Sequence, residues 1–391
     1  MKIVRIECFP IGVPLRFPIR LPNVNITQLN TVLVKIHADC GTVGIAESGD
    51  TSSWYRGESQ ASICATICDV FARQILLGED PRNLEKIVGA MDVISRENFQ
   101  AKALVDCALH DLLGKAQGVP VYQLLGGRTR ESVPLGWVLS AGEPDDVAQR
   151  ARRAVDNGFV QLKVKVGRHT YDRDVASVAA VRAEVGDAIR VVLDANGSWH
   201  YETALKMLRR LDPYGLDFVE QPVPYNDLEG MARLRNKVGT PIYADEAVQE
   251  PQDLLRVVKA GAADGVILKL QKMGGLTKAR KFLAVAEMLD IPILSSSLVG
   301  STFEAAPSAH LMVSNRWASN FITESTGPLV VHGTMNSSEI SPDTDLATEI
   351  PLFESGVTAP LDKPGFGLEL NEAVFERCRG SEPARVARMP V

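Results

Sequence analysis

Residues 158–167 read GFVQLKVKVG, a short run typical of a β-strand in which lysine occupies alternate positions. Side chains alternate across a strand, so Gln161, Lys163 and Lys165 share one face while the valines and the leucine share the other. The apolar face suits packing against a layer of helices. The other face carries two ammonium groups that point the same way, which is unusual for a core and suggests a site.

Strands of this kind recur along the chain and alternate with helical patterns. Because parallel strands need a crossover of a dozen or more residues, a strand and a helix at a spacing of roughly 25 to 30 residues form a βα unit. Eight such units close naturally into a barrel. The sequence therefore predicts an α/β fold built on a (β/α)₈ TIM barrel. The eight strand segments are PLGWVLS (134–140), VQLKVKV (160–166), RVVLDAN (190–196), DFVEQP (217–222), PIYADEA (241–247), GVILKL (265–270), PILSSS (292–297) and FITES (321–325).

The chain before the barrel predicts a smaller unit of mixed α and β structure. Two β-branched runs, KIVRIECFPIGV (2–13) and TVLVKIHADCGTVGIAESG (31–49), predict an antiparallel sheet, and helical patterns follow. The segment after the barrel is rich in Pro, Gly, Ser and Thr, and we expect it to return to the N-terminal part. The expected division is a capping domain over 1–128, a barrel over 129–326 and a C-terminal segment over 327–391.

The composition limits the classes of partner. The 391 residues carry a net charge of −6, and no long run of lysine or arginine is present, which disfavours nucleic acid and anionic membranes. No stretch approaches 18 uninterrupted apolar residues and the start lacks a signal sequence, so we expect a cytoplasmic protein. The six cysteines include no C-x-x-C pair, which argues against a disulfide framework or a zinc ribbon.

Three consecutive strands each end in a carboxylate, namely Asp194, Glu220 and Asp245. One such acid alone would more often cap a helix, but three in register would repel one another in a dry pocket, and a bound dication is the simplest compensation. Oxygen ligands without histidine or cysteine at matching positions favour Mg²⁺ or Mn²⁺ over zinc. Asn196 and Glu246 follow these acids closely and are expected to support them.

Two lysines flank the three carboxylates, because strand two carries Lys165 and strand six ends in Lys269. A substrate carboxylate bound to the ion would have an acidic α-proton, since the ion stabilises the enediolate, and a base is needed near that carbon. Two opposed lysines allow removal on one face and return on the other. Lys163 is expected to supply a neighbouring cation that, with burial, favours the neutral form of Lys165.

Several motifs together resemble the enolase superfamily and, within it, the muconate lactonizing enzyme subgroup. The motifs are LKVKVG (162–167), LDANGSW (193–199), VEQPV (219–223), ADEA (244–247), KLQKMGG (269–275), GKAQGVPVYQLLGG (114–127), TESTGP (323–328) and KPGFGLEL (363–370). The resemblance implies an α+β capping domain over a modified (β/α)₇β barrel, a small carboxylate substrate and a homo-oligomer, an octamer or smaller.

The resemblance also implies a role for individual residues. It implies Mg²⁺, with Mn²⁺ as a possible substitute, at the three strand-end carboxylates, and Lys165 and Lys269 as the acid/base pair. It further implies Lys163 and Asn196 as close supports and Glu324 as a strand-eight acid near the site.

The family performs several reactions on one scaffold, so departures from its patterns guide the choice of reaction. Dipeptide epimerases carry a D-x-D motif after strand eight, where this chain has Glu324, Ser325 and Thr326. The run TESTGPLV (323–330) is closest to muconate cycloisomerases, whereas SSSLVGSTFEAA (295–306) differs from their strand-seven segment. We expect muconate-type cycloisomerisation. The alternative is racemisation or epimerisation of an N-acylamino acid, amino-acid or proline derivative, or an o-succinylbenzoate synthase-like reaction.

Substrate contacts are expected from two capping-domain loops, residues 16–23 and 49–57, and from the end of strand seven. The candidates are Arg16, Arg20, Trp54, Tyr55, Ser296, Ser297 and Leu298. Two other classes stay open. A Schiff-base aldolase would use a barrel lysine to attack a carbonyl and would survive chelation, and a non-catalytic binding protein would retain only the barrel.

Overall fold

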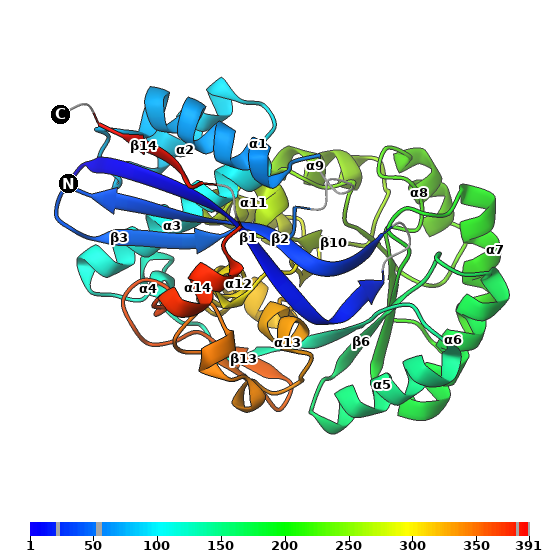
Figure 1. Cartoon of the computed structure of the whole chain (residues 1–391). Helices are drawn as coiled ribbons and strands as arrows, with labels where there is room; N and C mark the ends of the chain where they lie inside the picture. Colours follow the sequence, from blue (N-terminus) through cyan, green and yellow to red (C-terminus); the bar gives the residue numbers. More distant parts are fainter. Residues whose placement is uncertain (21–23, 52–56, 381–382, 390–391) are drawn as a thin grey trace.

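The computed structural model describes residues 1–20, 24–51, 57–380 and 383–389, and shows a parallel barrel beside an antiparallel sheet (Figure 1). The barrel is a seven-stranded parallel sheet in which every strand pairs with its neighbours in the sequence. The α/β barrel with an antiparallel capping sheet that the sequence predicted is confirmed. The strands are β5 (Gly136–Leu139), β6 (Gln161–Lys165), β7 (Arg190–Asp194), β8 (Phe218–Glu220), β9 (Ile242–Ala244), β10 (Gly265–Leu268) and β11 (Ile293–Ser295).

The eighth predicted strand differs from the prediction, because residues 321–325 do not form a full strand. Thr323 alone closes the barrel, through parallel bridges to Leu135 on one edge and to Ser295 on the other. The chain turns immediately afterwards, where the N–H of Thr326 donates to the carbonyl of Glu324 at 2.8 Å. The early turn shortens this strand to a bridge but leaves Glu324 at the same rim as the other strand ends.

Helices cover the outside of the barrel, and their sequences show why they begin and end where they do. Pro251 opens α9, Glu250 and Asp253 form a capping box, and Leu254 and Val257 face the core. The helices between or after the barrel strands are α5 (Pro144–Asp156), α6 (Tyr171–Val185), α7 (Tyr201–Leu211), α8 (Leu228–Arg235), α9 (Pro251–Lys259), α10 (Leu270–Met273), α11 (Leu276–Met288) and α12 (Thr302–Ser314). The short 3₁₀ turns η2 (Asp212–Tyr214) and η3 (Ala318–Asn320) connect them.

An apolar cluster fills the interior of the barrel below the strand ends. Val192, Phe218, Ile267, Leu294 and Ile322 are buried together there. The barrel is therefore a packed core rather than a pore.

The capping sheet has the strand order β14-β1-β2-β3. The strands β1 (Ile3–Arg20) and β2 (Asn25–Ala38) form a long antiparallel hairpin, β3 (Val43–Glu47) pairs with β2, and the C-terminal β14 (Arg385–Arg388) pairs with β1. Figure 1 shows β1 and β2 in blue reaching from this sheet toward the barrel, with β14 in red beside β1. The antiparallel sheet predicted from the two N-terminal runs is confirmed.

Helix α3 (Phe99–Gln117) lies at the seam between the capping sheet and the barrel. Its Asp111 accepts the N–H of Ile45 in β3 at 2.8 Å, and its Asp106 accepts the N–H of Thr277 in α11 at 3.1 Å. It ends at Gly118, whose φ of 71° is the left-handed conformation that favours glycine. The other helices of this part are α1 (Gln60–Ala65), η1 (Thr66–Leu76), α2 (Leu84–Ile94) and α4 (Val121–Leu124).

The chain after the barrel runs back over the cap. It contains α13 (Gly327–His332), η4 (Ser337–Glu339), η5 (Pro342–Thr344), β12 (Leu352–Glu354), β13 (Val357–Ala359) and α14 (Glu372–Cys378). The strands β12 and β13 form a small sheet with β4 (Val133–Pro134). All six cysteines are free thiols, and no helix in the described ranges is both long and apolar enough to cross a bilayer.

Candidate active site

The candidate site lies at the carboxyl ends of the barrel strands, where register brings the predicted residues together. Lys165 is the β6 partner of Asp194 in β7, and Asp194 is in turn the partner of Glu220 in β8. Asp245 follows β9 directly, and Lys269 follows β10 directly. The register of these parallel strands aligns their carboxyl ends and thus places all five side chains at one rim.

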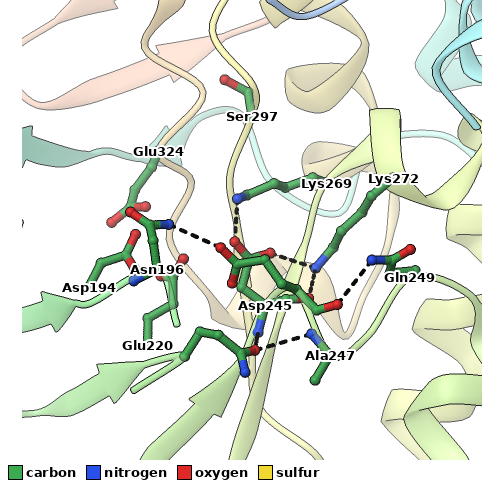
Figure 2. Close-up of polar contacts among 12 residues, drawn as sticks. Asp194, Asn196, Glu220, Asp245, Ala247, Gln249, Lys269, Lys272, Ser297 and Glu324 are labelled. Atoms are coloured by element: carbon green, nitrogen blue, oxygen red, sulfur yellow. Dashed lines mark hydrogen bonds and ion pairs between the residues drawn. The ribbon is translucent and has the colours of Figure 1, made fainter. Parts of the chain in front are cut away.

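The lysines and the carboxylates form buried ion pairs. Lys163 Nζ lies 2.5 Å from Glu220 Oε2 and also contacts Glu324. Lys165 pairs with Asp194. Lys269 pairs with Asp245 (Figure 2). The side chains of Lys163 and Lys269 are only 2% and 7% exposed, so these pairs are shielded from solvent.

Charge and burial shift the pKa values of this cluster strongly. Burial raises the pKa of Glu220, and the charges of Asp194 and Asp245 raise it further. For Asp245, burial raises the pKa, but the cations Lys269 and Lys272 outweigh it and lower the net value. For Lys269, burial lowers the pKa, but the charge of Asp245 and the other acids outweighs it, so the net value is raised. The lysines therefore act as counter-ions of the carboxylates in this arrangement.

The donor set suits a hard dication, although the ligands are not preassembled. Among the described residues, no group of three His, Cys, Asp or Glu side chains is already arranged to enclose a metal. The carboxylates turn to the lysines instead. Glu220 Oε1 is nevertheless buried and has no hydrogen-bond donor among the described residues. A buried, unpartnered carboxylate oxygen beside two further carboxylates is where a cation would be stabilised most.

Asn196 and Glu246, which the sequence analysis expected to support the carboxylates, are hydrogen-bonded into this cluster. The Asn196 N–H donates to Asp194 Oδ1 at 2.8 Å, and its Oδ1 accepts from Lys165 at 3.0 Å. Its Nδ2 donates to Glu246 Oε1 at 3.1 Å. The φ of 43° at Asn196 is a strained value for a residue with a side chain, which is common at functional sites.

Two contributing residues were missed by the sequence reasoning. Lys272 is fully buried, and its Nζ donates to both the carbonyl and the Oδ1 of Asp245 at 2.7 Å (Figure 2). Gln221 Oε1 accepts the N–H groups of Asp245 and Ala247 at 3.0 and 3.1 Å. Lys272 lies in the motif KLQKMGG and Gln221 lies in the motif VEQPV. The spacing of Lys272, about one helical turn after Lys269, is the sequence feature that could have identified it as part of the site.

Replacing Lys272 by methionine is expected to lower turnover by about 10- to 100-fold, because a carboxylate that loses its buried hydrogen-bond partner is no longer held in one orientation. Steady-state rates at saturating Mg²⁺ measure the effect. The matched control is Lys281→Met, because Lys281 is an exposed lysine of α11 that pairs with Glu85. Equal rates for both variants would show that Lys272 does not orient Asp245.

Two cavities lie at the cluster. The smaller one, of about 120 Å³, is lined by the lysines and carboxylates of the site and, from the β1–β2 hairpin, by Ile19 and Ile26. A larger one of about 750 Å³ lies on the other side of Asn196 and Glu246 and is bordered by Tyr225 and Arg256. The capping hairpin therefore forms part of the wall above the barrel rim.

The predicted substrate contacts have different outcomes. Ser296, Ser297 and Leu298 line the smaller cavity together with Lys165 and Lys269. Arg16 and Arg20 are exposed, and the neighbouring Ile19 lines the cavity in their place. Trp54 and Tyr55 lie outside the described residues.

A parallel barrel with carboxylates and lysines at its rim, under a capping sheet, defines a class of enzymes whose site lies between the two parts. Two family models match the chain. The mandelate racemase / muconate lactonizing enzyme N-terminal domain matches residues 3–126, and the enolase C-terminal domain-like model matches residues 146–374. The protein belongs to the mandelate racemase / muconate lactonizing enzyme family of the enolase superfamily. The relatives it matches include racemases, epimerases and cycloisomerases, so the chain is an isomerase of this family, which acts on small carboxylates.

Similar proteins differ in the reaction they perform. A mandelate racemase/muconate lactonizing family protein from Azoarcus sp. EbN1 has 50% identity and a TM-score of 0.94, with 99% of this chain and 100% of that chain covered. The N-succinyl-L-Arg/Lys racemase of Bacillus cereus is 33% identical over 96% of this chain and 97% of its own length. Muconate cycloisomerase 1 of Rhodococcus opacus is 32% identical over 95% and 96%. These comparisons establish the family.

Family members bind magnesium. The dipeptide epimerase from Enterococcus faecalis, solved with Mg and the dipeptide L-Leu-L-Tyr, is 32% identical with a TM-score of 0.85, and 94% of this chain and 100% of that chain are covered.

Proposed function

We propose that this protein is a Mg²⁺-dependent isomerase that moves a proton at the carbon next to a substrate carboxylate. The observation that carries the proposal is the pair Lys165 and Lys269. Each is ion-paired to a different carboxylate, and Glu220 lies between the two pairs in the strand order. One lysine in its neutral form can take up the α-proton on one face, while the other in its ammonium form delivers a different proton on the opposite face of the substrate.

Asp194, Glu220 and Asp245 would hold the ion, and Mn²⁺ would be a possible substitute. When bound, the ion supplies a Lewis acid that draws charge away from the substrate carboxylate and so acidifies the neighbouring C–H. The protein's own residues do the rest. Lys163 stays charged between Glu220 and Glu324, Asn196 orients Lys165, and Lys272 fixes Asp245.

Racemisation or epimerisation is the reaction best supported by the geometry. Such a reaction uses both lysines, whereas forming one new C–H bond in a cycloisomerisation needs only one proton donor. Apart from the barrel lysines, the described lining of the smaller cavity contains no arginine or lysine for a second carboxylate, and it includes Asp50 and several apolar side chains. We therefore propose an amino-acid derivative with one reacting carboxylate as substrate.

Muconate-type cycloisomerisation, the reaction that the sequence favoured, is the second candidate. The run TESTGPLV and the cycloisomerase relative support it. The proposal also includes a closed homo-oligomer, a cytoplasmic location and the division at residues 128 and 326, which rest on the sequence.

Proton exchange with solvent separates the two reactions. A racemase in D₂O with Mg²⁺ is expected to introduce deuterium at the α-carbon of an N-acylamino acid or proline derivative. Each turnover replaces the α-proton with a deuteron that comes from the solvent. Proton NMR of the recovered substrate measures the loss of the α-H signal. If recovered substrates stay fully protonated while muconate is converted to a lactone, cycloisomerisation replaces racemisation as the function.

A further inference from the structure

A second pair of buried carboxyl groups lies behind the wall of the substrate cavity. Glu47 ends β3 and Glu304 lies in the first turn of α12, and they are only 6% and 2% exposed. Both line one small cavity of about 10 Å³ at the seam between the capping sheet and the barrel. The chemistry described above uses neither of them.

Glu47 is well supplied with hydrogen-bond donors. Its Oε1 accepts from the Thr31 hydroxyl at 2.7 Å, and its Oε2 accepts the N–H of Ser301 at 3.1 Å and also the Ser301 hydroxyl. Because Ser301 is the N-cap of α12, Glu47 joins the capping sheet to the start of this barrel helix.

Glu304 has a different environment, in which one of its two oxygens lacks a donor. Gln271 Nε2 donates to its Oε1, but among the described residues nothing donates to its Oε2. Gln100 Oε1 and Gln271 Oε1, which belong to residues lining the same cavity, are also buried without a donor. Three buried acceptor oxygens without donors thus belong to residues around one small cavity. A protonated carboxyl group would supply an O–H donor there, whereas a carboxylate supplies none.

The electrostatic surroundings favour the protonated form of Glu304. Burial raises its pKa to about 8, and the negative charge of Glu47 adds to the effect. Burial also raises the pKa of Glu47, to about 7, and Asp345 contributes. The other titratable group lining the cavity is the Cys107 thiol of α3, whose pKa burial raises well above its usual value. Among the described residues that line the cavity, none is a lysine or an arginine that would stabilise a carboxylate.

Glu304 also contacts the residues that follow strand seven, 296–301, which we call the strand-seven wall. The Ser297 hydroxyl and the Gly300 N–H lie near the Glu304 carboxyl group and, like Gln271, lower its pKa, but burial outweighs them. A Cβ atom at Gly300 would lie 2.4 Å from the Cβ of Glu304, so glycine is required for this approach. Ser297 lines the substrate cavity and accepts the N–H of Val299 at 3.2 Å.

The backbone of the strand-seven wall is strained. Val299 has a φ of 63°, an unusual value for a β-branched residue. The N–H of Asp50 in the capping domain donates to its carbonyl at 2.9 Å. Such a conformation persists only when surrounding groups hold it, and here the cap holds it from one side and Glu304 from the other.

We propose that Glu304 is a positioning residue for the strand-seven wall of the substrate cavity, and that it acts as a hydrogen-bonded acid rather than as a carboxylate. Its single O–H supplies one donor to a cavity that is rich in acceptor oxygens, and its side chain fixes Ser297 and the turn at Gly300. The contact between the capping sheet and the barrel at Glu304 thereby fixes the shape of the strand-seven wall of the substrate cavity. The effect on substrate rests on the proposed function, whereas the protonation and the positioning do not.

The pH dependence of unfolding tests the protonation. An unfolded glutamate has a pKa of about 4.3, so between about pH 5 and 8 the folded protein holds one proton on Glu304 that the unfolded chain has released. Stability therefore falls as the pH rises through this range. In the natural protein, the release of this proton on unfolding should multiply the unfolding equilibrium constant by about ten for each pH unit. Glu304→Gln removes the titrating group, so the variant is expected to lack this tenfold factor. Urea unfolding at a series of pH values measures the slope.

Hydrogen exchange and kinetics test the positioning. Glu304→Ala is expected to speed amide exchange across residues 298–301 and to raise KM by about 10- to 100-fold with a smaller effect on kcat, because a misplaced wall weakens substrate alignment. Glu304→Gln, which keeps the shape and a donor, is expected to restore both. Glu354→Gln, at an exposed glutamate of β12, is the matched control and should leave the slope, exchange and KM unchanged.

An unchanged pH slope in Glu304→Gln would overturn the acid form of Glu304, and unchanged exchange in Glu304→Ala would overturn the positioning. If both change as expected but no carboxylate substrate is converted by any form, the proposed function fails while the role of Glu304 stands.

Discussion

Replacing either Lys165 or Lys269 by methionine is expected to lower turnover by about 10²- to 10⁴-fold, the usual contribution of a positioned acid or base. Each lysine is fixed by a carboxylate, Lys165 by Asp194 and Lys269 by Asp245, so neither can replace the other across the cavity. Steady-state rates of interconversion, followed by polarimetry or chiral chromatography, measure the effect.

The two variants should also differ from each other in proton exchange. Each keeps one lysine, so each is expected to exchange the α-proton of one enantiomer only, while the natural protein exchanges both. Lys281→Met, at an exposed lysine outside the site, is the control and should retain full activity. Near-native turnover in either active-site variant would rule out the two-lysine mechanism.

Much of the fold could be predicted because its signals are local. The regular spacing of short apolar strands along the sequence predicted the barrel. The acids at the ends of the third, fourth and fifth strand segments predicted which side chains lie together at the rim. Register then confirmed that Lys165, Asp194 and Glu220 are neighbours. The eighth strand was overestimated because composition cannot show that the chain turns after Thr323.

The unpredicted features depend on contacts between distant segments. Lys272 resembles any helical lysine until its distance to Asp245 is known. Glu47 and Glu304 are 257 positions apart in the numbering, and only the packing of β3 against the start of α12 brings them to one cavity. Arg20 and Ile19 are adjacent in β1 and point to opposite faces, and only the placement of the hairpin over the barrel shows that Ile19 is the one that lines the cavity.

Chelation is expected to lower turnover by about 10³-fold or more, since a Lewis acid contributes several kcal/mol at the transition state and about 1.4 kcal/mol is tenfold. The charges around Lys269 provide a second reason for this loss of activity. The acids around Lys269 outweigh burial and raise its pKa, so without an ion this lysine stays a charged partner of Asp245 and cannot accept a proton. Activity after EDTA treatment, and after Mg²⁺ or Mn²⁺ is added back, measures the effect.

Glu220→Gln provides the matched test of where the ion binds, because Glu220 is the acid whose Oε1 has no donor among the described residues. Mg²⁺ at 100 times its Kd should stabilise the natural protein by about 2.7 kcal/mol and raise its Tm, and this rise should be absent in the variant. Glu354→Gln, at the exposed glutamate, should respond as the natural protein does. Full activity in EDTA together with an adduct trapped by borohydride would instead identify a Schiff-base lysine, and the three carboxylates would then serve only as counter-ions of the lysines.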